Sequence, residues 1–337
     1  MPLILGRVNG TSPVKISIHD LAKRVGMSAA TVSRVMNNRH RVNDQTRQRV
    51  LEAAREAGFR PRVSSRATTV GVVIDWAPEF LEVGGGLVQA LALGVSAALA
   101  HHRLAVEIFT RGNLGTLQSR FLDGVLAIAW EPESLAAITA LENVPAVIFN
   151  RPEYPTLSNV QLDEVEVGRL AARHLIERGH THLGVIYTDN AQVNLSRLDG
   201  YRQEMAAAGL SLPHDHVGST LVLPSYATVQ RLLRAGVTGL FMMTDELTAE
   251  VPYLCGEVMQ MSLPKDLSLV GVGLAASMKY SRPPMTLIAP PYVAMADAAV
   301  SLLNDLIGSQ DRTRREIVLK PELVVRDSVT RPQGTSA

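Results

Sequence analysis

Cysteine and aromatic residues are scarce in this sequence of 337 residues. A single cysteine, Cys255, excludes a disulfide framework and any zinc or iron–sulfur site built from several cysteines, and it fits a reducing cytosol. Aromatic residues make up only 4% of the chain, so we expect an aliphatic core. The 46% of hydrophobic and 19% of charged residues are typical of a folded globular protein, and the length is that of two to three domains.

Long hydrophobic runs are also missing. No stretch approaches the ~18–20 apolar residues that a membrane span needs, and the first residues lack the apolar region and cleavage site of a secretory signal. We therefore expect a cytoplasmic protein with no membrane partner and with loose tails at residues 1–14 and 331–337.

Signatures of catalysis and of cofactor or metal binding are missing as well. Gly84–Gly86 is not followed by the Lys-Ser/Thr pair of a phosphate loop, and there is no serine nucleophile elbow. The pairs His180/His182 and His214/His216 have no further ligands at suitable spacing, whereas a structural zinc site needs about four. We expect a protein that is not an enzyme and has no cofactor and no metal. The remaining helical histidines are expected on the surface: His101, His102 and His174.

Charge is distributed unevenly although the whole chain has a formal net charge of +1. Residues 1–66 contain 13 Lys and Arg against 4 Asp and Glu, a net of +9, and the remainder contains 20 basic against 28 acidic residues, a net of −8. This asymmetry favours a small nucleic-acid-binding head on an acidic body. Charge alone leaves open a basic surface without a partner.

The pattern of residues 15–61 predicts a helix-turn-helix, which together with the basic charge favours DNA binding. A three-helix packing module with a solvated polar face is the alternative. Ser17 can cap a first helix, and Gly26 suits the left-handed conformation that ends it. Ser28 can cap a second helix with Val32, Val35 and Met36 on its inner face. A third helix is expected from Asp44 to Ala57.

The outer face of the second helix suits DNA recognition. Arg34 has a planar fork that can bind guanine in the major groove, worth ~1–3 kcal/mol of discrimination, and the methyl groups of Ala29 and Ala30 can lie against a thymine methyl. Polar side chains around the turn suit phosphate contacts, which fix register without reading sequence. The predicted phosphate contacts are Ser17, Ser28, Thr31, Ser33, Asn37 and Arg47.

These residues resemble the headpiece of the LacI/GalR family of bacterial transcription repressors. The matching positions are Ala22, Gly26, Ser28, Thr31–Arg34, Asn37, Thr46, Arg47, Gly58 and Pro61. The resemblance implies that Ala29, Ala30 and Arg34 read bases. It also implies a hinge, but the linker here, Arg62–Thr69, is shorter than in the family, and Thr68 stands where the family has a leucine wedge. Arg62, Ser65 and Arg66 could contact phosphates or a narrow minor groove, or belong to a flexible basic tether; both alternatives stay open.

The body, residues 70–330, alternates expected strands and helices. A continuous apolar run at Val70–Asp75 is typical of a buried parallel strand, and an Ala-rich helical pattern follows at Gly86–His101. Such repeated units predict doubly wound parallel sheets, and the series is long enough for two α/β lobes. The series restarts near residue 159. The LacI/GalR resemblance implies chain crossings near residues 159, 289 and 320, which assign residues 70–158 with 290–319 to one lobe and 159–289 to the other. Further expected elements include helices at Glu133–Glu142, Glu164–Arg178, Arg197–Ala208 and Val293–Ile307, and strands at Asn159–Leu162, Leu183–Tyr187 and Glu316–Leu319.

The body resembles the same family, which implies a fold like that of type I periplasmic binding proteins, with an effector between the lobes. The short stretch between Phe109 and Phe121 resembles the branch of the evolved-β-galactosidase repressor. Ligands bind at the carboxyl ends of strands in such sheets. The residues expected there are Asp75, Trp76, Trp130, Asn150, Arg151, Asp163, Thr244 and Asp245. The family resemblance implies that Arg197, at the start of a predicted helix, is a further effector contact. Carboxylate, amide and guanidinium groups beside tryptophan suit a sugar. Each also has a structural alternative, for example Asp163 as a helix cap.

We therefore predict a regulator, in particular a repressor of carbohydrate-utilisation genes, that binds double-stranded operator DNA as a homodimer. A small effector, such as a sugar or galactoside, would lower its DNA affinity allosterically. Two departures from the family pattern keep a non-sugar effector, or none, open: Thr244 precedes Asp245 where the family has Asn, and Gly273–Leu274 replaces an Asp-Asp pair. A cytosolic small-molecule-binding protein is the third alternative.

Overall fold

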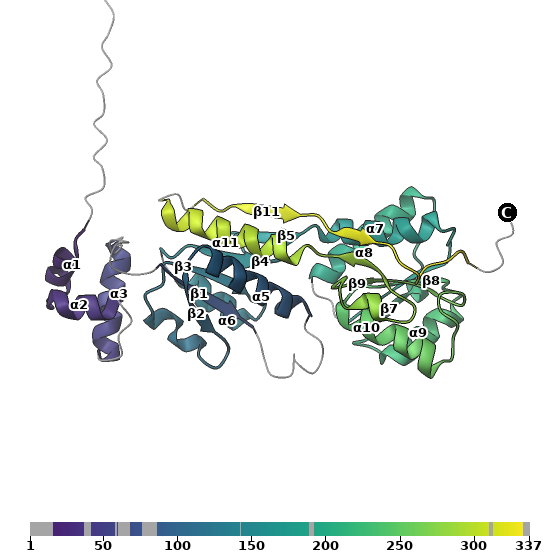
Figure 1. Ribbon diagram of the computed structural model, residues 1–337, viewed down its shortest axis with the longest axis horizontal. Helices are drawn as coiled ribbons and strands as arrows, with labels where there is room; N and C mark the ends of the chain where they lie inside the picture. Colours follow the sequence, from purple (N-terminus) through teal and green to yellow (C-terminus); the bar gives the residue numbers. More distant parts are fainter. Residues whose placement is uncertain are drawn as a thin grey trace, which may run out of the picture.

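The computed structural model describes residues 16–36, 42–57, 59, 68–75, 86–141, 143–188, 192–309 and 313–332. Figure 1 shows a small helical head at one end and two α/β lobes in a row beyond it. None of the helices within these residues combines the length and the apolar character that a membrane span requires.

The head contains three helices, α1 (Ile18–Val25), α2 (Ala29–Met36) and α3 (Asp44–Glu56). Ser17 caps α1 in a reciprocal arrangement with Asp20, and Gly26 ends the helix at a φ of 68°. The inner faces of the three helices form one buried cluster, which includes Leu21, Val32 and Leu51. The predicted helix-turn-helix is thus confirmed.

The first lobe has a six-stranded sheet in the order β11-β5-β4-β3-β1-β2, with every pair parallel. Helices α5 and α11 cover one face of this sheet, and α6 with the short 3₁₀ helix η1 covers the other. The strands are β1 (Thr69–Ile74), β2 (Ala105–Phe109), β3 (Gly124–Ile128), β4 (Ala146–Phe149), β5 (Ser158–Leu162) and β11 (Glu316–Leu319). The helices are α5 (Gly86–His101), η1 (Leu114–Ser119), α6 (Pro132–Thr139) and α11 (Tyr292–Gly308).

The second lobe repeats this plan, with strand order β12-β10-β9-β8-β6-β7 and only β12 antiparallel. Helices α7 and α8 pack on one face, and α9 and α10 pack on the other. The strands are β6 (Leu183–Tyr187), β7 (Val217–Ser219), β8 (Gly239–Met242), β9 (Ser268–Val272), β10 (Thr286–Ala289) and β12 (Glu322–Val324). The helices are α7 (Glu164–Glu177), α8 (Gln192–Ala207), α9 (Ser225–Arg234) and α10 (Asp245–Tyr253), with short turns η2 (His214–His216), η3 (Leu254–Val258) and η4 (Met278–Tyr280).

The chain crosses between the lobes after β5, after β10 and after β11. The predicted first crossing, before Asn159, lies too early in the chain: β5 pairs with β4 and β11 in the first sheet, so the crossing follows Leu162. Helix α8 begins at Gln192, five residues before the predicted start at Arg197. The predicted surface position of His174 is wrong, because its side chain is only 3% exposed and lies on the buried face of α7.

Helices α7 and α8 approach each other closely at two glycines. A Cβ atom on Gly168 would lie 1.9 Å from the carbonyl oxygen of Arg197, and one on Gly200 would lie 1.9 Å from the carbonyl oxygen of Val165. Only residues without a side chain allow the two backbones to come this near. The glycines therefore set the position of the first turns of both helices, where the candidate site lies.

Candidate functional site

The outer face of α2 carries the residues predicted to read bases. Ala30 and Arg34 are exposed, and Ala29 is half-buried. Ser28 caps the helix by accepting a hydrogen bond of 3.1 Å from the backbone of Thr31, and the two hydroxyls lie 2.9 Å apart. These contacts keep the amino end of α2 well formed, so Ala30 and Arg34 project from a rigid helix. Their contacts to bases remain a prediction.

The predicted phosphate contacts divide into two groups. Ser17 and Ser28 precede α1 and α2 and are exposed, whereas Thr31 and Ser33 lie within α2 and are half-buried. Arg47 lies inside the head instead, with only 6% of its surface exposed. A buried guanidinium cannot reach a phosphate without leaving its place, so the structure does not support the prediction for Arg47. Four predicted residues lie outside the described residues: Asn37 of the head, Arg62, Ser65 and Arg66 of the hinge. The same holds for Trp76 of the effector set.

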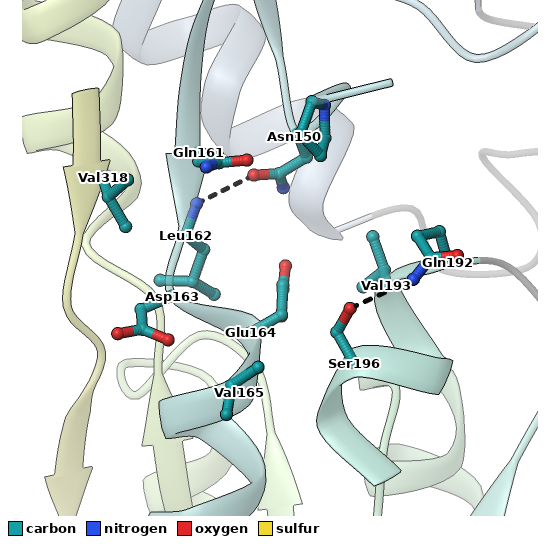
Figure 2. Close-up of a pocket in the computed structure, with 11 residues that line it drawn as sticks. Asn150, Gln161, Leu162, Asp163, Glu164, Val165, Gln192, Val193, Ser196 and Val318 are labelled. Carbon is teal, nitrogen blue, oxygen red and sulfur yellow. Dashed lines mark hydrogen bonds between the residues drawn. The ribbon is translucent and has the colours of Figure 1, made fainter. Parts of the chain in front are cut away.

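Two neighbouring cavities lie between the lobes, at the carboxyl ends of the first sheet's strands. The larger has a volume of about 240 Å³ and the smaller of about 90 Å³. Asn150, Leu162, Glu164 and Val193 line both of them. Figure 2 shows the larger one, with Asn150 and Leu162 of the first lobe facing the starts of α7 and α8. Of the predicted effector residues, Asn150, Asp163, Trp130, Arg151 and Arg197 line one cavity or the other.

Arg197 forms the central interaction of this site with a residue that the sequence analysis missed. Its Nε donates to Oε2 of Glu164 over 2.7 Å, and it also donates to the carbonyl oxygen of Met243. Both side chains of the ion pair are about nine-tenths buried, at 11% and 10% exposure. Burial raises the pKa of Glu164, and the positive charge of Arg197 opposes that shift. The pair is therefore a desolvated unit that depends on both partners.

The second carboxylate oxygen of Glu164 is the most informative atom in the cavity. Oε1 is buried and receives no hydrogen bond from any part of the chain that the structure describes. In Figure 2 the carboxyl group of Glu164 points into the space below Asn150. A buried acceptor without a hydrogen bond lowers the stability of the fold, so such an atom indicates a site where a ligand or water can donate a hydrogen bond. In the sequence, only the position of Glu164 could have indicated its role, because it comes two residues after the end of β5 at Leu162.

Several other predicted effector residues have structural partners. Asp75 accepts hydrogen bonds from the backbone of Trp130 at 2.7 Å and of Glu131 at 2.6 Å, and one from the hydroxyl of Ser134. It thus holds the start of α6 and lines neither cavity. Asp163 caps α7 by accepting from the backbone of Glu166 at 3.0 Å, although it still lines the larger cavity.

Thr244 and Asp245 lie at the start of α10. Thr244 caps that helix by accepting from the backbone of Leu247 at 3.5 Å. Asp245 lies against the start of α5 in the first lobe, because a Cβ atom on Gly86 would come within 2.7 Å of its Oδ2. Neither residue lines the two cavities. The structure therefore gives them a capping role and an interlobe contact, and their role in effector binding stays a prediction.

The histidine pairs take part in local structure. His180 bridges Thr238 and the carbonyl oxygen of Thr330, at 2.9 and 2.8 Å. His216 contacts the carbonyl oxygens of Leu183 and Ala235. No group of three metal-ligating side chains occurs among the residues that the structure describes.

Comparison with known proteins agrees with this architecture. Residues 17–62 match the bacterial regulatory proteins of the lacI family, and residues 172–329 match a periplasmic binding protein-like domain. The chain is 31% identical to an HTH-type transcriptional regulator from the aml 5′ region of Streptomyces limosus, over 94% of this chain and 95% of that protein. It is 27% identical to the HTH-type transcriptional repressor PurR of Pasteurella multocida, over 93% and 98%.

A solved structure is similar along almost the same length. It is a complex of the transcriptional regulator CelR with cellobiose, with a TM-score of 0.69, 26% identity, and coverage of 94% of this chain and 100% of that one. These likenesses run through the head and both lobes, which excludes a match limited to the widespread binding-protein fold. The chain therefore belongs to the LacI family of bacterial regulatory proteins and is a helix-turn-helix transcriptional regulator.

Proposed function

We propose that this regulator is a repressor that binds operator DNA as a homodimer and releases it when a small polyhydroxylated effector binds between the lobes. The observation that carries the effector proposal is the buried Glu164–Arg197 pair with its unsatisfied Oε1. The cellobiose bound by the similar regulator supports a sugar as the class of effector.

A sugar hydroxyl suits this pair because it donates and accepts at once. It can donate to Oε1 of Glu164 while its oxygen accepts from the Arg197 guanidinium or from the amide of Asn150. Satisfying a buried acceptor recovers a penalty of ~1–3 kcal/mol that the free protein bears. Leu162, Val165 and Val193 supply apolar walls for the C–H faces of a ring. The opposite charges of the pair cancel, which favours a neutral ligand.

The position of the pair explains how such a ligand would act on the lobes. Glu164 and Arg197 belong to helices of the second lobe, whereas Asn150 belongs to a strand end of the first. An effector that bonds to both groups is bound more tightly when the lobes are closed, so it shifts the population toward the closed form. A coupling of ~1–3 kcal/mol between effector and operator is typical of such systems.

The charge and the exposed recognition helix of the head support the proposal that this regulator binds operator DNA. Residues 1–66 have a net charge of +9, and Arg34 is exposed on α2. One recognition helix reads too few bases alone, so two heads would read a two-fold site with half-sites about one helical turn apart. We further infer a cytoplasmic protein without catalytic turnover, which hydrolysis of nitrophenyl glycosides by the purified chain would contradict.

Fluorescence anisotropy on DNA from the protein's own upstream region, titrated with a panel of sugars, tests the function. We expect tight binding that weakens steeply with salt, and release by one sugar. Tight binding that no sugar alters would favour a non-sugar effector or none. That outcome would agree with Gly273–Leu274, which replace the Asp-Asp pair of the family pattern at the end of β9. The absence of binding to any upstream fragment would refute the operator proposal.

Single substitutions test the roles proposed for Arg34 in reading bases and for Arg197 and Glu164 in binding the effector. Arg34→Ala should lose ~1–3 kcal/mol of base discrimination while weak nonspecific binding persists; equal weakening on all sequences would make Arg34 a phosphate contact. Arg197→Ala and Glu164→Gln should abolish the effector response and leave the operator affinity unchanged. Arg173→Ala is the matched control, because it removes a half-exposed ion pair with Glu204 from the same two helices away from the cavities.

A further inference from the structure

Phe121 of the first lobe is buried in the core of the head. It lies between η1 and β3, is only 8% exposed, and belongs to the same cluster of buried side chains as Leu51, Ala54 and Phe59 of the head. The next residue, Leu122, belongs to the core of the first lobe instead. Two neighbours in the chain are thus buried in two different units, so the segment Arg120–Asp123 joins them by side-chain packing.

The linker between head and body ends at this same segment. The backbone N–H of Thr69 donates to Oδ2 of Asp123 over 2.7 Å, and the N–H of Asp123 donates to the carbonyl oxygen of Thr69 over 2.8 Å. On the head side, Phe59 is packed in the cluster that contains Phe121. Residues 60–67 therefore connect two points that are both fixed near residues 121–123.

The contact between head and lobe extends beyond one side chain. Helix α3 contacts η1, and Figure 1 shows α3 as the helix of the head that faces the first lobe. Arg120 is fixed by an ion pair of 3.4 Å to Glu107 of β2, so the docking segment is anchored to the sheet on both sides of Phe121. Ala30 and Arg34 of α2 remain exposed in this arrangement. The docked head can therefore present its recognition face to DNA.

We propose that Arg120–Asp123 is a docking surface for the chain's own DNA-binding head, and that this contact transmits the movement of the first lobe to the recognition helix. A linker of eight residues alone could span ~26–29 Å and would leave the head free to take many positions. Packing of Phe121 into the head removes that freedom, so the head moves with the lobe. The transmission, but not the docking, rests on the effector-controlled DNA binding proposed above.

Distance measurement between spin labels tests the docking without DNA or effector. Cys255 is the sole cysteine and is buried, so labels can be placed at Gln45→Cys in the head and Ala140→Cys in the first lobe, both exposed. We expect a narrow distance distribution in the full chain, a broad one after Phe121→Ala, and an intermediate one after Phe121→Leu. The control Ile108→Ala removes an exposed apolar side chain of the same lobe and should leave the distribution narrow. A parent chain as broad as Phe121→Ala would overturn the docking.

Operator binding then tests the transmission. Phe121→Ala should bind operator, because the head keeps its own three-helix core, and it should bind the effector, because the cavities lie at the opposite ends of the strands. The effector should lower operator affinity by ~5–150-fold in the parent chain and in Ile108→Ala, and by less than about twofold in Phe121→Ala. An unchanged response in Phe121→Ala, with a broad distance distribution, would overturn the transmission. Failure of the parent chain to bind DNA would count against the proposed function, and the spin labels would still decide the docking.

Discussion

Replacing Gly168 by alanine tests whether the contact between α7 and α8 holds the candidate site together. The new Cβ would lie 1.9 Å from the carbonyl oxygen of Arg197 and 2.7 Å from the amide nitrogen of Tyr201. Ordinary contact begins near 3.4 Å, so the helices must separate by roughly 1.5 Å. Both opposing atoms are backbone, so no side chain can rotate away. The displaced carbonyl belongs to Arg197 itself, so its ion pair with Glu164 should be broken as well.

The expected loss of stability follows from this geometry. Overpacking of a core costs ~1–3 kcal/mol when side chains can adjust, and we expect at least about 3 kcal/mol here because they cannot. At ~2–4 °C per kcal/mol, the melting temperature should fall by ~6–12 °C. Urea unfolding followed by circular dichroism measures the change. Gly308→Ala is the matched control: nothing lies within 4 Å of that added Cβ at the end of α11, so stability should stay the same or rise by ~0.5–1 kcal/mol. A loss below about 1 kcal/mol in Gly168→Ala would refute the close contact.

Two further predictions concern carboxylates: the structural role of Asp75 and the pH dependence that Glu246 gives to stability. Asp75→Ala should lower the free energy of unfolding by ~2–4 kcal/mol, because it leaves the N–H groups of Trp130 and Glu131 and the hydroxyl of Ser134 without their acceptor; unchanged stability in urea with a weakened effector response would instead make Asp75 a ligand contact. Burial, reinforced by the charge of Asp245, raises the pKa of Glu246 from 4.5 to about 7. The folded state then binds this proton more tightly than the unfolded chain, so the free energy of unfolding should decrease as the pH rises from about 4.5 to about 7. Urea midpoints measured across this range should show a smaller decrease in Glu246→Gln, and equal slopes would contradict the desolvation of this half-buried carboxyl group.

Much of the fold could be predicted because its strands are short, continuous apolar runs. Strands such as β1 and β9 are buried along their length, and that burial is what the runs indicate. The start of α8 was missed because Gln192–Ser196 is largely polar and lacks an apolar period. Strand β12 was missed because it is only three residues long and lies at the edge of its sheet. The lobe boundary was misplaced because β5 and α7 are consecutive in sequence yet belong to different lobes.

The candidate site was predicted only in part, for a different reason. The carboxyl ends of the strands gave Asn150, Trp130, Arg151 and Asp163, and the family resemblance gave Arg197; all five line the cavities. The same rule also selected Asp75, whose hydrogen bonds fix α6, because a strand-end carboxylate suits a helix start as well as a ligand. Glu164 needed the position of Arg197 on another helix to be recognised, and the burial of Arg47 depends on packing within the head. Such relations are tertiary and leave no local pattern.

The first sheet links the proposed effector site to the docking segment Arg120–Asp123. Because the sheet can move as one body, this link does not require a chain of side-chain rearrangements between the two sites. Strand β3 begins at Gly124, just after the docking segment, and ends at Ile128, just before Trp130 of the smaller cavity. Strand β1 likewise begins at Thr69, which is bonded to Asp123, and ends near the same cavity wall. At ~3.3 Å per residue, these strands are ~17–20 Å long, and they place head and effector at opposite ends of one parallel sheet. The sheet is packed on both faces, so it moves as a rigid body. A rotation produced by closure around Glu164 and Arg197 would therefore reach Phe121 undiminished, and the head packed on Phe121 would rotate with it.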